Sequence, residues 1–361
     1  MQVSAYVIST DPLIIHGYNY SNVITPAKEL SPYLKKHKVT YVISIAWSLH
    51  VHNRLARVGR LYAEHKRKFP NHEIIILAND QREFDGLHEL GVPTIMCNHN
   101  SFINEKNFTI VPAEKQYDGV INSRMQPYKR IELARETKNL CLVASEVYQN
   151  PEYTKYVTST MPYMDFVQFV DGKFTKPLTK VQLSELYGKC RCGLILSAAE
   201  GACFAAGEYL LCGLPVVTTH NKGGRDTFYH SDYTIWCDDN PESVKEAVQK
   251  AATLTISPEE IRERALGLMH EHRENYIAKL NEIALAAGKN IDFNSRWDEL
   301  CLNNKIKTYI TEKDALKYFH SLGISTSFAP YRTFRHYHEG FKKVLKRLKR
   351  RMYTLFNPIK Y

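Results

Sequence analysis

Residues 200–226, EGACFAAGEYLLCGLPVVTTHNKGGRD, constrain the fold of this chain more than any other stretch. The segment before it, CGLILSA at 192–198, is short and apolar, as expected of a buried parallel strand. A helix is expected after Gly201, and Gly213 is its C-terminal stop. The result is a strand–loop–helix–strand unit with Glu200 at the strand's carboxyl end, the edge where ligands bind in open α/β sheets.

The two carboxylates of this stretch, Glu200 and Glu208, favour a polyol phosphate ligand. We expect the N–H groups of Gly201, Ala202 and Cys203 to point out of the helix N-terminus, which attracts phosphate. Glu208 lies two turns further along, roughly 12 Å away by helix rise. Its carboxylate can accept hydrogen bonds from two neighbouring hydroxyls, as a ribose diol offers. Two glutamates alone are more typical of a solvated helix face, and the small residues around them favour the ligand site.

A second group of residues supports the same kind of ligand. The sequence predicts a short strand at 118–122 and a helix at 128–136, YKRIELARE. Arg124 and Lys129 flank the turn around Pro127 between these elements. Two cations at such a turn can clamp a diphosphate, since Arg offers a planar fork and Lys a point charge. Taken alone, they are more typical of solvated surface cations.

Together these stretches resemble the family-four glycosyltransferases of GT-B fold, which are retaining enzymes that use nucleotide-sugar donors. The resemblance extends from about residue 118 to about residue 252. It rests on Arg124-x4-Lys129, LSELYGKCRCGLILSAAEG, Glu200-x7-Glu208, CGLPVV, and Gly223-Gly224 before Asp226.

The resemblance implies a role for each of these residues. Arg124 and Lys129 would hold the donor pyrophosphate and Glu200 would contact the transferred sugar, and these three form the expected catalytic set. Glu208 would bind the ribose hydroxyls. The rest of the expected donor site is Gly201, Ala202, Cys203, Ser197 and Gly17. The chain departs from the family at Cys203-Phe204, where the family has Gly plus an aliphatic residue, so the donor-sugar pocket is expected to differ in shape.

The resemblance also implies that the chemistry needs no metal ion, no cofactor and no base from the protein. The departing phosphate can take the acceptor's proton, and no Asp-x-Asp motif occurs in the donor half. A UDP-sugar is the default donor. His16 and Gly17 are expected to contact donor phosphate or acceptor in a cleft between domains. His50, His52 and His99 are expected to be structural or surface histidines.

The order of predicted elements indicates an α/β protein of two Rossmann-like halves. Its strands are expected at 4–9, 39–46, 73–78, 93–97, 118–122, 140–145, 166–170, 192–197, 215–218 and 233–236. Helices are expected between them and at 257–286 and 312–321, the last crossing back to the first half. With the resemblance, this predicts a GT-B fold whose two domains face a cleft. The expected divisions are an acceptor domain at 1–115, a donor domain at 116–288 and a helical extension at 289–361.

The extension carries most of the net charge of +10. Residues 332–361 hold ten Lys or Arg and one acid, so they contribute +9. Apolar residues recur among the cations at helical spacing, which predicts a basic amphipathic helix at 335–356 that binds an anionic membrane surface. A helix docked on the protein remains an alternative. Nucleic acid is the least favoured partner because no nucleic-acid motif accompanies the charge.

Composition is that of a globular protein, with 44% hydrophobic and 24% charged residues. No run of eighteen apolar residues and no signal peptide is recognised. The eight cysteines show no zinc pattern and are expected to be free and mostly buried. We therefore expect a cytoplasmic enzyme, peripheral at the inner face of a membrane, that transfers a sugar to a glycan or lipid-linked acceptor during surface polysaccharide assembly. A nucleotide-sugar epimerase of the same fold and a non-catalytic, membrane-recruited scaffold remain alternatives.

Overall fold

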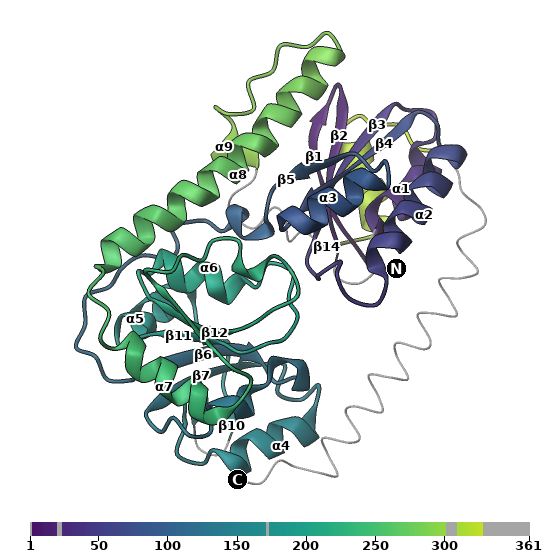
Figure 1. Cartoon of the computed structure of the whole chain (residues 1–361). Helices are drawn as coiled ribbons and strands as arrows, with labels where there is room; N and C mark the ends of the chain where they lie inside the picture. The colour runs from purple at the N-terminus through teal and green to yellow at the C-terminus, as the bar shows by residue number, and fades with distance from the viewer. Residues whose placement is uncertain (1, 20–23, 171–172, 301–308, 328–361) are drawn as a thin grey trace. The chain divides into compact units, whose positions relative to one another are not determined.

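The computed structural model describes residues 2–19, 24–170, 173–300 and 309–327, and Figure 1 traces the chain. The chain divides into two compact units. Within the described residues, unit 1 comprises residues up to 102 and from 269 to 327, and unit 2 comprises residues 103–268. The division therefore falls inside the long helix α8 (Pro258–Ala286) and not at residue 288 as expected. The second half of α8 belongs to unit 1 because Tyr276 and Leu280 pack into its core.

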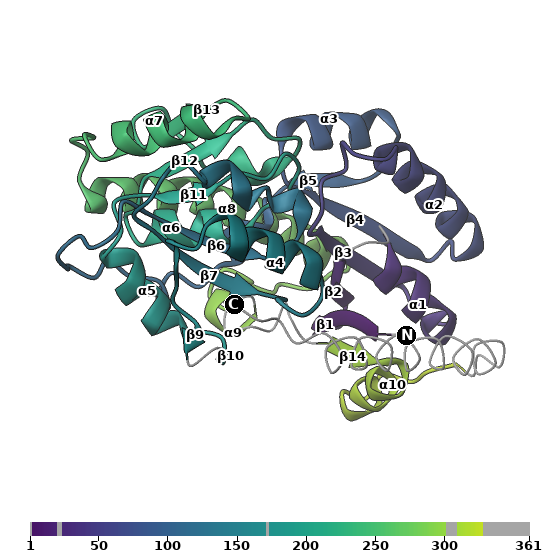
Figure 2. The same ribbon diagram turned by 90° about the horizontal axis from the view of Figure 1, so that it is seen from below.

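Unit 1 is built on a six-stranded sheet in the order β14-β1-β2-β3-β4-β5. Strands β2 to β5 are parallel, whereas β1 pairs antiparallel with both β2 and β14. Figure 2 shows β14 beside β1, with α10 next to them. The strands are β1 (Gln2–Thr10), β2 (Leu13–Asn19), β3 (Val39–Ile45), β4 (His72–Ala78), β5 (Thr94–Met96) and β14 (Tyr309–Thr311). Strands β2 and β14 are absent from the prediction, which left His16-Gly17 in a loop.

The two faces of this sheet are covered by different helices, as the alternation of strand side chains requires. One core cluster joins Ile15, Tyr41 and Ile76 of the strands to residues of four helices. These are α1 (Thr25–Leu34), α2 (Arg54–Lys68), α3 (Gln81–Glu89) and α10 (Glu312–Ser321). Because α10 packs here, the prediction that 312–321 returns to the first half is confirmed. The other cluster places Ile14 and Val42 against α8.

Unit 2 is built on a fully parallel sheet in the order β13-β12-β11-β6-β7-β8. Its strands are β6 (Gly119–Arg124), β7 (Leu140–Ser145), β8 (Asp165–Phe166), β11 (Gly193–Ile195), β12 (Val216–Thr219) and β13 (Thr234–Cys237). A separate pair is formed by β9 (Phe169–Val170) and β10 (Lys173–Phe174). Helices α4 (Pro151–Thr160) and α7 (Pro241–Ala251) cover one face, and α5 (Lys180–Gly188) and α6 (Phe204–Leu211) cover the other (Figure 1).

Local signals set most boundaries of unit 2. Gly213 ends α6 in a left-handed conformation with φ of 70°, as predicted. The Asn240 side chain caps α7 by accepting a hydrogen bond from the Ser243 N–H. The expected helix at 128–136 is wrong, because two 3-10 turns, Pro127–Lys129 and Ile131–Ala134, replace it. Arg130 separates them with a φ of 52°, which no α-helix accommodates.

Two further expectations concern composition. The seven cysteines of the described residues are free, and all but Cys203 are buried, so this expectation is confirmed there. Among the described residues, no helix is both long and apolar enough to cross a membrane. The predicted membrane-binding segment at 335–356 lies outside the described residues.

Candidate functional site

The predicted site residues of unit 2 gather at the carboxyl edge of its parallel sheet. Arg124 ends β6, Ser197 and Glu200 follow β11, and the glycine pair 223–224 follows β12. Strand β11 pairs with both β6 and β12, so these loops are neighbours along one edge. Because side chains from separate loops meet there, this edge is the natural ligand position of the sheet.

Lys129 and Glu200 form a buried ion pair in the structure. The Lys129 Nζ donates to Glu200 Oε1, and their side chains are only 14% and 7% exposed. Burial by itself lowers the pKa of Lys129, but the neighbouring Cys203 and Glu200 raise this pKa above its ordinary value. Lys129 therefore carries a charge at neutral pH. The sequence assigned these residues to different groups on a donor and did not predict their contact.

A pocket with an empty volume of about 260 Å³, part of it open to solvent, lies beside this pair. Its polar lining consists of Asn122, Ser123, Lys129 and Ser197. Ser197 is 1% exposed, and its Oγ has no hydrogen-bond partner among the described residues. A buried hydroxyl without a partner costs free energy unless something hydrogen-bonds to it, which a polar ligand can do. The pocket thus combines a buried cation with an unsatisfied hydroxyl.

Two arginines that the sequence analysis missed fix the loops of this edge. Arg225 is 1% exposed and donates to the backbone carbonyls of Ser197 (2.7 Å) and Thr219 (2.5 Å). Arg130 donates to the Leu196 carbonyl (2.7 Å) and the Thr219 Oγ1 (2.7 Å). Each guanidinium therefore ties the end of β11 to the end of β12. The sequence patterns singled out the neighbours of these arginines, Lys129 and Asp226, but neither arginine itself.

Glu208 lies in the second turn of α6, and its carboxylate is held by two neighbours. Its Oε2 accepts hydrogen bonds from Asn122 Nδ2 (3.3 Å) and from the Tyr187 hydroxyl (3.3 Å). Asn122 lies on β6, and Tyr187 lies on α5. No sequence pattern singled out either of these two residues. These two donors fix the orientation of the Glu208 carboxylate, and its role in binding ribose hydroxyls stays a prediction.

Residues 201–203 were expected to begin the helix, but they form a loop before it, because α6 begins at Phe204. Helix rise therefore does not give the separation of Glu200 from Glu208. Cys203 precedes the helix with φ of 56° and ψ of 90°, a conformation that glycine adopts more easily. Gly201 and Ala202 are buried beside it. The predicted departure at Cys203 thus falls on a backbone position where its side chain has a conformational cost.

Arg124 is more exposed than Lys129. Its Nε lies 3.7 Å from Glu146 Oε1, and 43% of its side chain is exposed. Both Arg124 and Lys129 lie near enough to Tyr128 to lower the pKa of its phenol, although burial and the acidic neighbours raise that pKa overall. That Arg124 and Lys129 clamp a diphosphate together stays a prediction.

His16 and Gly17 lie inside unit 1, on β2. The His16 ring is 1% exposed, and its two nitrogens contact the Tyr276 hydroxyl (2.7 Å) and Ser44 Oγ (2.9 Å). Burial lowers the pKa of His16 to about 3, so it is neutral. A Cβ on Gly17 would lie 2.6 Å from Pro26 side-chain atoms, so a close approach of α1 explains this glycine. These partners give both residues a packing role.

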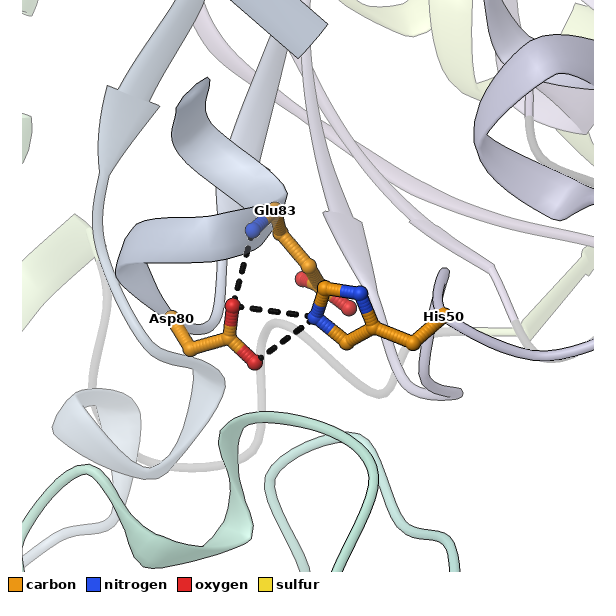
Figure 3. Close-up of side chains that lie close together, drawn as sticks. All are labelled: His50, Asp80 and Glu83. Atoms are coloured by element: carbon orange, nitrogen blue, oxygen red, sulfur yellow. Dashed lines mark hydrogen bonds and ion pairs between the residues drawn. The ribbon is translucent and has the colours of Figure 1, made fainter. Parts of the chain in front are cut away.

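Unit 1 also holds a polar cluster, shown in Figure 3, at the carboxyl ends of β3 and β4. His50 Nε2 lies 3.0 Å from Asp80 Oδ2. The buried Glu83 carboxylate accepts from the backbone N–H groups of Leu49 (2.8 Å) and Asn79 (3.0 Å), and burial raises its pKa. Among the described residues, these three side chains are the group whose geometry admits a metal ion. That the reaction needs no metal stays a prediction.

The other two histidines of the prediction are not members of this cluster. His52 is exposed and left-handed, with φ of 55°. His99 is 2% exposed and stacks on Tyr18, with ring centroids 4.5 Å apart. Both positions agree with surface and structural roles.

Comparison with known proteins assigns a family to the segment that carries the two glutamates. Residues 171–267 match the model described as glycosyl transferases group 1. The protein is a glycosyltransferase. No sequence among curated proteins matches the chain. The match spans the loops after β11 and β12 and helix α6, and thus both Glu200 and Glu208.

Solved structures support the fold. The Anabaena protein Alr3699/HepE, solved in complex with UDP, is 15% identical, with a TM-score of 0.53 over 75% of this chain and 78% of that chain. Sucrose-phosphate synthase from Thermosynechococcus elongatus is 17% identical, with a TM-score of 0.50 over 70% of this chain and 69% of that chain. The α/β architecture therefore resembles that of GT-B glycosyltransferases.

Proposed function

We propose that this glycosyltransferase moves a sugar from a nucleoside-diphosphate sugar to an acceptor hydroxyl, with retention of anomeric configuration. The observation that carries the proposal is the buried Lys129–Glu200 pair beside the pocket that Ser197 lines. A diphosphate entering there would meet a charged ammonium in a site of low dielectric, where electrostatic stabilisation is strongest. UDP is the first nucleotide to test, since the Anabaena protein of the same fold was solved with it.

The reaction breaks the bond between the sugar C1 and the diphosphate oxygen and forms a bond between C1 and the acceptor oxygen. Negative charge develops on the departing diphosphate, and Lys129 and Arg124 would stabilise it. The acceptor proton would pass to the departing phosphate, so no protein base is needed. Glu200 would orient the transferred sugar, and Glu208 would bind the ribose.

A donor screen tests the proposal. Purified protein would be heated with UDP, GDP, ADP and CMP and with their common sugar conjugates. A ligand that binds only the folded state stabilises it by about 2.7 kcal/mol at a hundred times its Kd. We expect one nucleoside diphosphate to raise Tm, and we expect Glu208→Ala to lose most of that shift. A Tm that no nucleotide changes would contradict the donor site and favour a non-catalytic scaffold.

Two finer points need separate tests. Proton NMR of the first product formed reports the anomeric configuration, and an inverted product would end the retention proposal. Turnover of the donor to another nucleotide sugar without any acceptor would favour an epimerase instead.

We also propose that the protein is cytoplasmic and binds an anionic membrane surface through residues 335–356, which agrees with assembly of a lipid-linked surface glycan. Deletion of 335–361 is expected to abolish binding to vesicles of phosphatidylglycerol while leaving the thermal unfolding of both units unchanged. Full-length protein that does not sediment with these vesicles would contradict the membrane role.

A further inference from the structure

Three side chains from three elements of unit 2 form a closed hydrogen-bonded ring. Asn122 Nδ2 donates to the Tyr187 hydroxyl at 2.8 Å. Both groups also donate to the same oxygen, Oε2 of Glu208, each at 3.3 Å. Because β6, α5 and α6 each supply one member, the carboxylate is fixed relative to the sheet edge and not only to its own helix.

Buried aromatic side chains pack around this hydrogen-bonded ring. Tyr187 is 1% exposed, and its aromatic ring packs edge-on against that of Tyr209, with centroids 5.0 Å apart. The Tyr209 hydroxyl accepts from the Asn122 backbone N–H at 2.7 Å. Burial, followed by the charge of Glu208, raises the pKa of Tyr187 well above its ordinary value. Its phenol therefore keeps its proton at neutral pH and can only donate it toward Glu208.

We propose that Asn122 and Tyr187 position Glu208 so that the donor site selects ribonucleotides and rejects their 2′-deoxy counterparts. This inference rests on the proposed function, since it needs a nucleotide in unit 2. A carboxylate accepts about four hydrogen bonds, so two ribose hydroxyls can join the two protein donors. A nucleotide without the 2′-hydroxyl leaves one hydrogen-bond position of the Glu208 carboxylate unfilled. Sites that hydrogen-bond a ligand hydroxyl bind analogues without that hydroxyl much more weakly.

The Tyr187 hydroxyl could act by orienting Glu208 or only by supporting the fold, and the two roles have different effects on nucleotide binding. If Tyr187 only supported the fold, removing its hydroxyl would weaken every nucleotide by the same factor. If it orients Glu208, removing the hydroxyl weakens the binding of the nucleotide that carries the 2′-hydroxyl and leaves that of the 2′-deoxy nucleotide nearly unchanged. The ratio of two dissociation constants, for 2′-deoxy-UDP and for UDP, therefore reports positioning alone.

Calorimetric titration of the full chain with UDP and 2′-deoxy-UDP provides the test. Wild-type protein is expected to bind UDP roughly ten to a hundred times more tightly, the strength of one hydrogen bond to a charged group. In Tyr187→Phe this ratio should fall by about five-fold or more, mainly through weaker UDP binding. Asn122→Ala, whose side chain is only half-buried, should do the same and serves if Tyr187→Phe does not fold.

Tyr233→Phe is the matched control. Tyr233 is also buried in unit 2, but its hydroxyl donates to the Phe228 carbonyl (2.9 Å) and not to Glu208, so its loss should leave the ratio unchanged. Variants at Asn122 and Tyr187 that keep the wild-type ratio would overturn the inference alone. Wild-type protein that binds both nucleotides equally would do the same. Wild-type protein that binds neither nucleotide would overturn the proposed function, and the inference with it.

Discussion

Lys129 is the residue whose surroundings say most about the site. Its charge is buried and is balanced by the Glu200 carboxylate. Removing one partner of such a pair is costly, about 3–5 kcal/mol, because the other charge is left without compensation. A diphosphate could replace the carboxylate as the balancing charge.

A substitution at Glu200 tests this exchange. Glu200→Gln should lower the Tm of the protein without ligand, since Lys129 then loses its negative neighbour. UDP should raise the Tm of this variant by more than it raises the Tm of wild-type protein, because the nucleotide restores the balance. The measurement is thermal unfolding with and without UDP. Glu152→Gln, at an exposed glutamate of the same unit, is the control and should keep the wild-type UDP shift. Equal UDP shifts in wild type and Glu200→Gln would contradict the exchange.

Cys203 is the second residue with a local consequence. A residue other than glycine in its conformation, φ of 56°, costs about 1–3 kcal/mol. Cys203→Gly removes this cost. Part of the gain is offset because glycine gives the unfolded chain more conformational entropy. We expect a free energy of unfolding equal to or above that of wild type. Cys203→Val should be less stable by about 1–3 kcal/mol because a β-branched residue tolerates positive φ poorly. Urea unfolding measures both, and a Val variant as stable as the Gly variant would contradict the strain.

At the scale of elements, Arg130 explains why two 3-10 turns replace the helix expected at 128–136. The apolar spacing of 128–136 fits a helix, but the Arg130 guanidinium reaches the Leu196 carbonyl and Thr219 Oγ1 from a left-handed backbone. These partners lie more than sixty residues away in sequence, so no local pattern announces them. Arg130→Met should therefore lower the stability of unit 2 by about 2–4 kcal/mol, as two buried carbonyl and hydroxyl acceptors lose a charged donor. The measurement is urea unfolding followed by the fluorescence of Trp236, in a background that carries Trp47→Phe and Trp297→Phe, with Arg135→Met as a surface control.

The elements that could be predicted are those with strong local signals. Strands such as β3, β4 and β7 are continuous apolar runs, and Gly213 and Asn240 mark helix ends by their own chemistry. Strand β2 was missed because His16 and Gly17 interrupt its apolar run, and the side chains that bond to the buried His16 come from Ser44 and Tyr276. The ring around Glu208 was missed for the same reason, since Asn122 and Tyr187 reach the carboxylate only in the folded sheet.

At the scale of the whole molecule, the two units differ in their buried titratable groups. Unit 1 encloses His16 and His272, whose pKa values burial lowers to about 3 and about 4. In the unfolded chain each has a pKa of about 6.5. The unfolded state therefore binds more protons below pH 6.5, and stability falls as pH falls from 6.5 toward 4. Above pH 6.5 this contribution is fully present.

Unit 1 should consequently be the acid-sensitive half of the chain. Each of these two histidines costs about 1.6 kcal/mol of stability between pH 6.5 and pH 5, so the two together cost about 3 kcal/mol. Replacing the single tryptophan of unit 2 by Trp236→Phe leaves Trp47 and Trp297, both in unit 1, as the fluorescent reporters. Urea midpoints followed by this fluorescence should drop steeply between pH 7 and pH 5. In that background, His272→Gln should flatten the slope and the exposed His52→Asn should not. A midpoint independent of pH would show that these histidines are not neutral and buried in the folded protein.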